Sequence, residues 1–183
     1  MAISSGQPQA ALRAALENGS LAGNWALDPA RSTAALRTKS MWGLVPVKGA
    51  FGDIEGGGQV SPAGEVNGRI ALATGSLDTG NKKRDTHLRS GDFFLSEKYP
   101  AITFTLGDLV PASEGVTVSG VLTVRDQSGP LSFPASVALA GDGEVVLDAA
   151  VQVDRSEFGI TWNQMGMTSM KSTVIIHAVF TKS

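Results

Sequence analysis

Residues 84–104 read RDTHLRSGDFFLSEKYPAITF, which brings an ionic cluster, two adjacent phenylalanines and an extended segment together in one short connection. Residues 84–89 predict a short helix, and residues 92–94 predict a second turn. Tyr99-Pro100 marks the entry to a strand, because apolar and polar side chains alternate over residues 102–104. The stretch therefore predicts a helix and a turn that lead directly into a wall strand.

Alternation of apolar and polar residues continues through the rest of the chain beyond Gly23 and predicts an all-β class. Gly, Pro, Asp and Asn separate about eight or nine candidate strands. Closing such a sheet into an antiparallel barrel would remove exposed edges, and a barrel of about eight strands either packs its interior or holds one small ligand. Periodicity alone leaves barrel and sandwich open. The candidate strands cover residues 23–28, 33–39, 45–54, 66–76, 102–106, 116–124, 130–140, 145–153 and 174–180.

The first residues show a helical pattern instead. Residues 8–18 carry one apolar stripe that includes Leu12 and Leu16. We expect this helix to cover one end of a barrel, with a lid or a dimer contact as the alternative. The chain accordingly divides into an N-terminal helical extension, residues 1–22, and a β domain, residues 23–183.

Composition narrows the classes of function. The 183 residues contain no cysteine, which excludes disulfides, zinc-thiolate sites and cysteine nucleophiles. A formal net charge of −2, from 17 acidic and 15 basic side chains, gives no broad positive field, so we expect no nucleic-acid partner. Polar residues interrupt the N-terminus before any apolar run of signal-peptide length, which predicts a cytoplasmic protein. Nothing approaches the ~20 consecutive apolar residues of a membrane span, so we expect no stable membrane insertion.

A set of short motifs, taken in order, resembles the YceI-like family, also called polyisoprenoid-binding proteins. The resemblance runs from about Asn24 to Phe180 and implies an eight-stranded antiparallel lipocalin-like β-barrel with short helices. It also implies that a homodimer is plausible. The motifs are Trp25-Ala26-Leu27-Asp28, residues 47–51, Ser76-Leu77-Asp78-Thr79, residues 84–94, residues 118–123, and the late turn at residues 154–160 with its Arg155-x-x-Phe158-Gly159 pattern.

The same resemblance implies non-catalytic binding of a long apolar isoprenoid, either a polyprenyl chain or an isoprenoid quinone, for transport, storage or stress protection. A dry apolar cavity suits such a partner, since each buried CH₂ gains about 0.8 kcal/mol. No cofactor is expected apart from the bound lipid. A scavenger of exogenous hydrophobic compounds would need the same cavity and is the first alternative.

The candidate cavity lining consists of large apolar residues. They lie at the alternate strand positions that face inward, and near the two helical turns. For each of them an ordinary packed core is the competing interpretation. The candidates are Ile70, Leu72, Phe93, Phe94, Ile102, Phe104, Leu106, Val118, Leu122, Phe158, Trp162, Met165 and Met167.

The ionic cluster allows two interpretations. Arg84, Asp85, His87 and Arg89, joined by Lys39, could contact a polar head group at a cavity mouth. The favoured alternative is a structural clamp in which Arg84 and Asp85 pair with each other or with backbone to lock the short helix over the barrel.

An enzyme is the second alternative class. His87 and His177 are the only histidines, which excludes a three-His metal site, and the alternation around His177 points it outward. A small-barrel enzyme acting on an isoprenoid would therefore have to use His87. Gly56-Gly57-Gly58 lacks the strand and helix context of a phosphate-binding loop. We predict no catalytic residue and no metal site.

Overall fold

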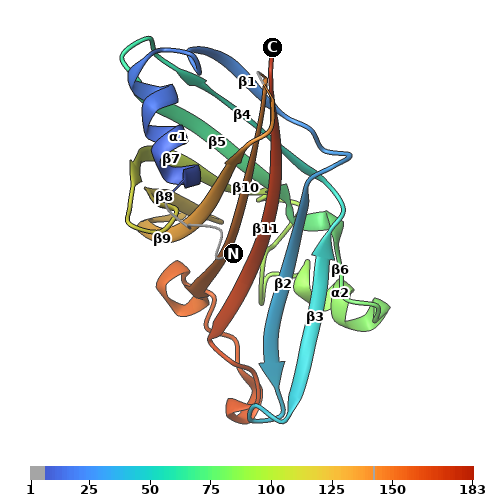
Figure 1. The fold of residues 1–183 in the computed structure, drawn as a ribbon. Helices are drawn as coiled ribbons and strands as arrows, with labels where there is room; N and C mark the ends of the chain where they lie inside the picture. Colours follow the sequence, from blue (N-terminus) through green and yellow to red (C-terminus); the bar gives the residue numbers. More distant parts are fainter. Residues whose placement is uncertain (1–6, 142) are drawn as a thin grey trace.

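The computed structural model of the chain describes residues 7–141 and 143–183. Antiparallel segments of one sheet dominate it, and a helix lies at one end (Figure 1). The strands are β1 (Gly23–Leu27), β2 (Thr33–Ser40), β3 (Val45–Phe51), β4 (Ile54–Val60), β5 (Val66–Ala73), β6 (Leu77–Asp78), β7 (Ala101–Pro111), β8 (Val116–Val124), β9 (Gln127–Leu139), β10 (Glu144–Asp154) and β11 (Lys171–Lys182). The helices are α1 (Gln7–Glu17) and α2 (Lys82–Leu88), with 3₁₀ turns at Thr74–Ser76, Arg155–Phe158 and Gln164–Gly166.

The sheet closes on itself because β1 pairs with β4 on one side and with β11 on the other. β1 and β2 follow each other along the same edge of β11, where Leu27 lies opposite Phe180 and Thr33 opposite His177. In the same way β3 and β4 pair with β2 and β1, and β6 continues the line of β5 beside β3. Each such pair is one bent wall strand, so the wall is a closed eight-stranded antiparallel barrel. The predicted fold class is confirmed.

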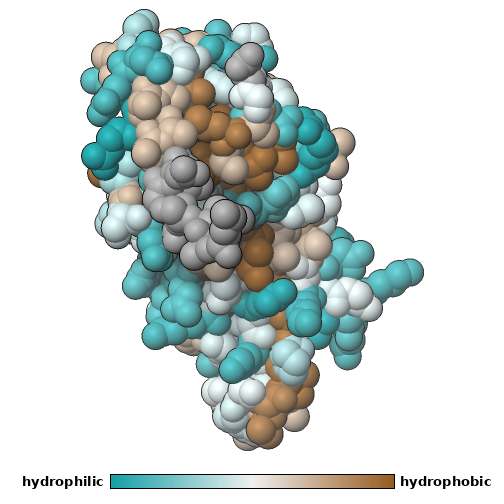
Figure 2. All heavy atoms as spheres, viewed as in Figure 1, coloured by the Kyte–Doolittle hydropathy of each residue, from teal (hydrophilic) through white to brown (hydrophobic). Residues whose placement is uncertain are grey.

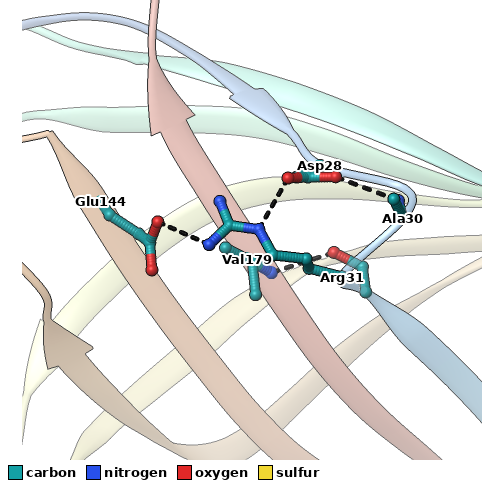
Figure 3. A network of polar contacts seen from close by, with 6 residues as sticks. Asp28, Ala30, Arg31, Glu144 and Val179 are labelled. Atoms are coloured by element: carbon teal, nitrogen blue, oxygen red, sulfur yellow. Dashed lines mark hydrogen bonds and ion pairs between the residues drawn. The ribbon is translucent and has the colours of Figure 1, made fainter.

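Polar contacts stabilise the bend between β1 and β2 and join it to β10. Asp28 accepts hydrogen bonds from Ala30 N and from Arg31 Nε, and Arg31 Nη1 also pairs with Glu144 at 2.8 Å (Figure 3). The Arg31 guanidinium holds the pKa of Asp28 below its ordinary value. Because these groups are exposed, we assign them to positioning the bend rather than to stability.

The period-two pattern determines which side chains enter the barrel. On β7, β10 and β11 alternate apolar residues, such as Ile102, Val151 and Ile176, border the interior. The buried apolar side chains form three clusters. One surrounds Phe51 and Leu72, one lies against α1, and one lies at the late turn. Burial of each such side chain stabilises the fold by about 1.5–3 kcal/mol.

One wall strand, β4, was not recognised as a separate strand in the sequence, because its centre is Gly56-Gly57-Gly58 and glycine disfavours strands. The tight approach of β4 to its neighbours explains the glycines. A Cβ on Gly58 would lie 2.3 Å from Asn67 O of β5, and one on Gly57 would lie 2.8 Å from Trp25 O of β1. Glycine is therefore required here for close backbone approach, and no phosphate loop exists at this position.

The predicted N-terminal helix is α1, which lies against one end of the barrel (Figure 1). Leu12 and Leu16 are buried in one cluster with Val116, Val118 and Ala135. Since an isolated helix of this length is marginal, the packing of this stripe accounts for its stability.

The segment between β6 and β7, which contains α2, completes the wall where neighbouring strands end. Asn81 caps α2 by accepting a hydrogen bond from Arg84 N. Arg89 Nη2 donates to Leu77 O at 3.3 Å, and Arg125 Nη1, from the β8–β9 turn, donates to Phe93 O at 3.3 Å. The segment thus bridges the β3–β6 side of the barrel and the β8–β9 turn.

Candidate functional site

The barrel encloses a cavity of about 470 Å³. This volume lies within the roughly 300–1,000 Å³ that is usual for sites of small organic molecules. Large apolar side chains from every part of the wall line it, and α1 contributes Leu12 and Leu16 at one end. The interior is consequently a cavity and is not filled by side chains. Of the candidate lining residues, those that border it are Ile70, Leu72, Phe93, Phe94, Ile102, Phe104, Leu106, Val118, Leu122, Phe158 and Trp162.

Met165 and Met167 do not border the cavity. Residues 163–167 turn outward instead, with Met165 in the left-handed region at φ 54° and 80 % exposed. Trp42 holds this loop in place, because Trp42 N donates to Met167 O and Trp42 Nε1 donates to Met165 O. No strand alternation exists here that could have told inward from outward side chains.

An aromatic group forms the wall at the α2 side of the cavity. The Phe93 and Trp162 ring centroids are 5.4 Å apart, and the His87 ring stands edge-on to both, at 5.1 Å and 4.5 Å. His87 Nε2 also contacts Asp92 Oδ2 at 2.8 Å. The short helix and the late turn, 75 residues apart in the sequence from His87 to Trp162, therefore meet at one place.

Arg84 and Asp85 both bind Thr79, at the end of β6. Arg84 Nε donates to Thr79 Oγ1 at 2.8 Å, and Arg84 Nη2 donates to Thr79 O at 2.9 Å. Asp85, only 7 % exposed, accepts from Thr79 N and Thr79 Oγ1. The hydrogen bond from the Thr79 hydroxyl lowers the pKa of Asp85 below its ordinary value. The hydrogen bond from Thr79 N and the charges of nearby arginines act in the same direction. The two residues thus clamp α2 through Thr79 rather than through a direct pair.

The five residues of the ionic cluster do not all lie at the cavity. Lys39, Arg84 and His87 border the cavity, whereas Asp85 and Arg89 do not. Arg89 donates instead to the backbone carbonyl of Leu77, in a part-buried contact. Only three of the five candidates therefore lie where a ligand in the cavity could meet them.

Arg155 borders the cavity and was not among the candidate residues. Its guanidinium donates to Ser169 O, Ile160 O and Thr168 O, and it lies 5.4 Å from the Phe93 ring centroid. Burial lowers the pKa of Arg155 from its ordinary value, and arginine remains charged at neutral pH. The Arg-x-x-Phe-Gly pattern of the late turn was the available signal.

The ionisable side chains along the cavity are all basic. No Asp or Glu borders it among the residues that the structure describes. Except for Arg69 on β5, these bases lie with hydroxyl groups near the loops that follow β2 and precede β11, and we call this region the polar end. Besides Lys39, Arg84, His87 and Arg155, it contains Thr38, Ser40, Thr79, Thr168, Ser169 and Ser172. An apolar cavity with a basic polar end suits an amphipathic guest whose head accepts hydrogen bonds.

His177 lies outside the cavity, as its parity predicted. Its Nδ1 contacts Asp148 Oδ1 at 2.6 Å across the β10–β11 ladder, in an exposed position. Over residues 7–141 and 143–183 there is no group of three or more His, Asp or Glu side chains that could hold a metal ion. Within the same ranges no helix has the length and apolarity to cross a membrane.

Several solved structures share this architecture. BcnA of Burkholderia cenocepacia aligns with a TM-score of 0.75 and 23 % identity, over 84 % of this chain and 98 % of BcnA. A domain from Saccharophagus degradans, described as polyisoprenoid binding and implicated in plant cell wall breakdown, aligns with a TM-score of 0.70 and 16 % identity, over 87 % and 98 %. At these identities the likeness concerns the fold.

Sequence relatives and a family model identify the protein family of this chain. A UPF0312 protein of Photorhabdus laumondii is 38 % identical over 52 % of this chain and 50 % of its own length. A UPF0312 protein of Yersinia enterocolitica is 29 % identical over 70 % of each chain, and Protein YceI of Escherichia coli is 34 % identical over 51 % and 50 %. The match thus spans half the length of the Photorhabdus and Escherichia proteins. The model of the YceI-like domain matches residues 25–180, and the chain therefore belongs to the YceI-like family.

Proposed function

We propose that this protein binds a long apolar isoprenoid lipid, a polyprenyl chain or an isoprenoid quinone, in the barrel cavity and performs no chemistry on it. The observation that carries the proposal is the cavity itself, about 470 Å³ of mostly apolar space closed at one end by α1. Each CH₂ transferred into it from water gains about 0.8 kcal/mol, so a chain of several isoprene units binds well without a covalent bond. Transport, storage or protection of the lipid are roles that such a carrier can fill.

The polar end is where the head group of the lipid is expected to lie. Arg84 donates hydrogen bonds to Thr79 from Nε and Nη2, and its Nη1 makes no hydrogen bond with the described residues. That nitrogen, with Lys39, can donate to a phosphate or a quinone carbonyl. Arg155 adds positive charge there, although its donors serve three backbone carbonyls.

Family membership supports a lipid-binding barrel. The domain from Saccharophagus degradans with the same fold is described as polyisoprenoid binding, and none of the relatives named above carries the name of an enzyme. The kind of isoprenoid and the direction of its transfer belong to the proposal.

Organic extraction of protein purified from its native host, followed by mass spectrometry, tests the proposal directly. An isoprenoid at near-stoichiometric amount is the expected result. Titration of lipid-free protein with polyprenols and quinones should in parallel change the tryptophan fluorescence, because Trp25 and Trp162 border the cavity. A clean extract together with an unchanged fluorescence would eliminate the carrier function, and an extract of unrelated hydrophobic compounds would identify a scavenger.

Substitution of one cavity residue localises the binding. Phe94→Asp puts a charge on the apolar wall, and we expect the affinity for polyprenol to fall by roughly tenfold or more, since a charge in apolar surroundings is costly. Val121→Asp, at an exposed position of β8, is the matched control for the added charge. Unchanged polyprenol binding by a folded Phe94→Asp protein would exclude Phe94 from the binding site.

The enzyme alternative makes a separate prediction. His87 borders the cavity and contacts Asp92, so a reaction on the bound lipid would depend on this pair. Incubation of loaded protein should leave the lipid chemically unchanged by mass spectrometry. Conversion of the lipid by the native protein, abolished in His87→Ala, would replace the carrier with an enzyme.

A further inference from the structure

Two loops form an exposed apolar tip beyond the polar end of the cavity. The β2–β3 turn and residues 163–167 project together at the lower end of the molecule, where hydrophobic atoms gather on the surface (Figures 1 and 2). Trp42 is 62 % exposed, Leu44 81 % and Met165 80 %, with Met41 and Val45 also exposed. We call these five residues the apolar tip.

The apolar tip is a built structure rather than a loose loop. Trp42 donates its backbone N–H to Met167 O at 3.2 Å and its indole N–H to Met165 O at 3.3 Å, which joins the two loops. Met41 and Trp42 are both in the left-handed region, at φ 50° and 56°. Non-glycine residues adopt this conformation at an energetic cost, and such strain persists where the surroundings impose it. The backbone thus holds large apolar side chains in water.

Basic residues surround the apolar tip. Residues 33–52 contain Arg37, Lys39 and Lys48, residues 158–175 contain Lys171, and neither segment contains an acidic residue. The carboxylates nearest to the apolar tip along these two segments of the sequence are those of Asp53, Asp154 and Glu157. Asp154 faces Lys171 across the β10–β11 ladder and accepts hydrogen bonds from Ser156. The two segments that form the tip therefore carry only basic charges, whereas the whole chain has a net charge of −2.

From this combination we propose that the apolar tip docks on anionic lipid membranes, inserting Trp42, Leu44 and Met165 into the interfacial layer. Tryptophan is enriched at membrane–water interfaces, and flanking Lys and Arg add attraction to anionic lipid. A second copy of this chain is a poorer occupant, since a stable interface buries about 800 Å² per partner and two basic tips would repel each other. The tip is also convex and narrow (Figure 1), which suits insertion.

Docking would bring the cavity to the membrane. Lys39 and Ser40 border the cavity and directly precede Met41, while Thr168 and Ser169 border it and directly follow Met167. The polar end would then face the lipid head groups. This consequence rests on the proposed function, whereas docking itself depends only on the apolar tip and its basic surroundings.

Vesicle sedimentation tests the proposal with the full, lipid-free protein. We expect binding to vesicles of phosphatidylcholine with phosphatidylglycerol, weaker binding to phosphatidylcholine alone, and loss of the difference at high salt. The double variant Trp42→Ser with Leu44→Ser should bind roughly tenfold more weakly or worse. The matched control, Val110→Ser with Val121→Ser, removes two exposed apolar side chains elsewhere and should bind normally. Circular dichroism verifies that both variants are folded.

Equal vesicle binding by the tip variant and the native protein, or no binding by the native protein, would overturn docking. Self-association of the native protein that disappears in the tip variant, without vesicle binding, would make the tip a protein interface instead. Polyprenol titration in solution separates the two proposals, because Trp42 and Leu44 do not border the cavity and their variant should keep its affinity. Vesicle binding without polyprenol binding would refute the proposed function alone.

Discussion

Thr79 is the residue on which the clamp formed by Arg84 and Asp85 depends. Thr79 forms hydrogen bonds with Arg84 and Asp85 at the same time. Without it, both side chains would lose their principal hydrogen-bond partner. The sequence predicted a clamp formed by Arg84 and Asp85, but it did not indicate that the clamp closes on a third residue from the end of β6. A hydroxyl that serves an acid and a base together has no signature in local spacing.

The clamp makes stability dependent on pH. Asp85→Asn keeps the shape of the side chain but removes its charge, and we expect the free energy of unfolding at pH 7 to fall by about 1–3 kcal/mol. The folded-state pKa of Asp85 lies below its ordinary value, so its contribution is present above pH ~4 and disappears as the pH falls through the folded pKa.

Urea unfolding between pH 7 and pH 3 measures this effect. The gap between native protein and Asp85→Asn should narrow at the acidic end of the series. Asp126→Asn, at an exposed position, is the control for removal of one negative charge. A gap that is absent at pH 7 would show that the carboxylate does not stabilise α2.

At the scale of elements, β4 shows how tertiary contact overrides propensity. Its three glycines argue against a strand, yet β4 pairs with both β1 and β5 and is needed for closure. The pattern that identifies a strand is alternation of side chains, and residues without side chains cannot display it. α1 and the alternating strands β7, β8, β10 and β11 were predictable because each has an apolar stripe or face to bury.

Gly58→Ala tests the reason for the glycines. The added Cβ would meet Asn67 O at 2.3 Å, and we expect the free energy of unfolding to fall by roughly 1–3 kcal/mol, as for other overpacked sites. Gly75→Ala is the matched control, since nothing lies within 4 Å of its Cβ position. Thermal or urea unfolding of both variants provides the measurement. Equal stability of the two would mean that β4 has room to move away from β5.

At the scale of the whole molecule, we expect that a larger side chain can fill part of the cavity without disturbing the wall. Ala149 points into the cavity and Ala150, its neighbour on β10, points to solvent. Ala149→Leu should reduce the affinity for polyprenol by roughly tenfold while leaving the unfolding free energy within about 1 kcal/mol, because the new atoms occupy empty space.

Ala150→Leu adds the same atoms outside the barrel and should leave polyprenol affinity unchanged. Fluorescence titration and urea unfolding of the two variants give the comparison. Equal affinities for polyprenol would place the ligand outside the part of the cavity that Ala149 borders.

The sequence by itself determined the class of the molecule. Alternation along the strands, the helical stripe of α1 and the order of short motifs were sufficient for an eight-stranded barrel of the YceI-like family, because these signals are local and recur along the chain. They also indicated most of the wall residues, since parity decides which side chains of a regular strand face inward.

Only the tertiary structure decided that the barrel is hollow, that the ionisable groups bordering the cavity are basic, and that Met165 and Trp42 meet on an exposed tip. A filled and a hollow barrel have the same alternation, because the remaining volume depends on the sizes of side chains from all the strands at once. The polar end and the apolar tip join segments more than 100 residues apart, such as Trp42 and Met165, so no local pattern could bring them together.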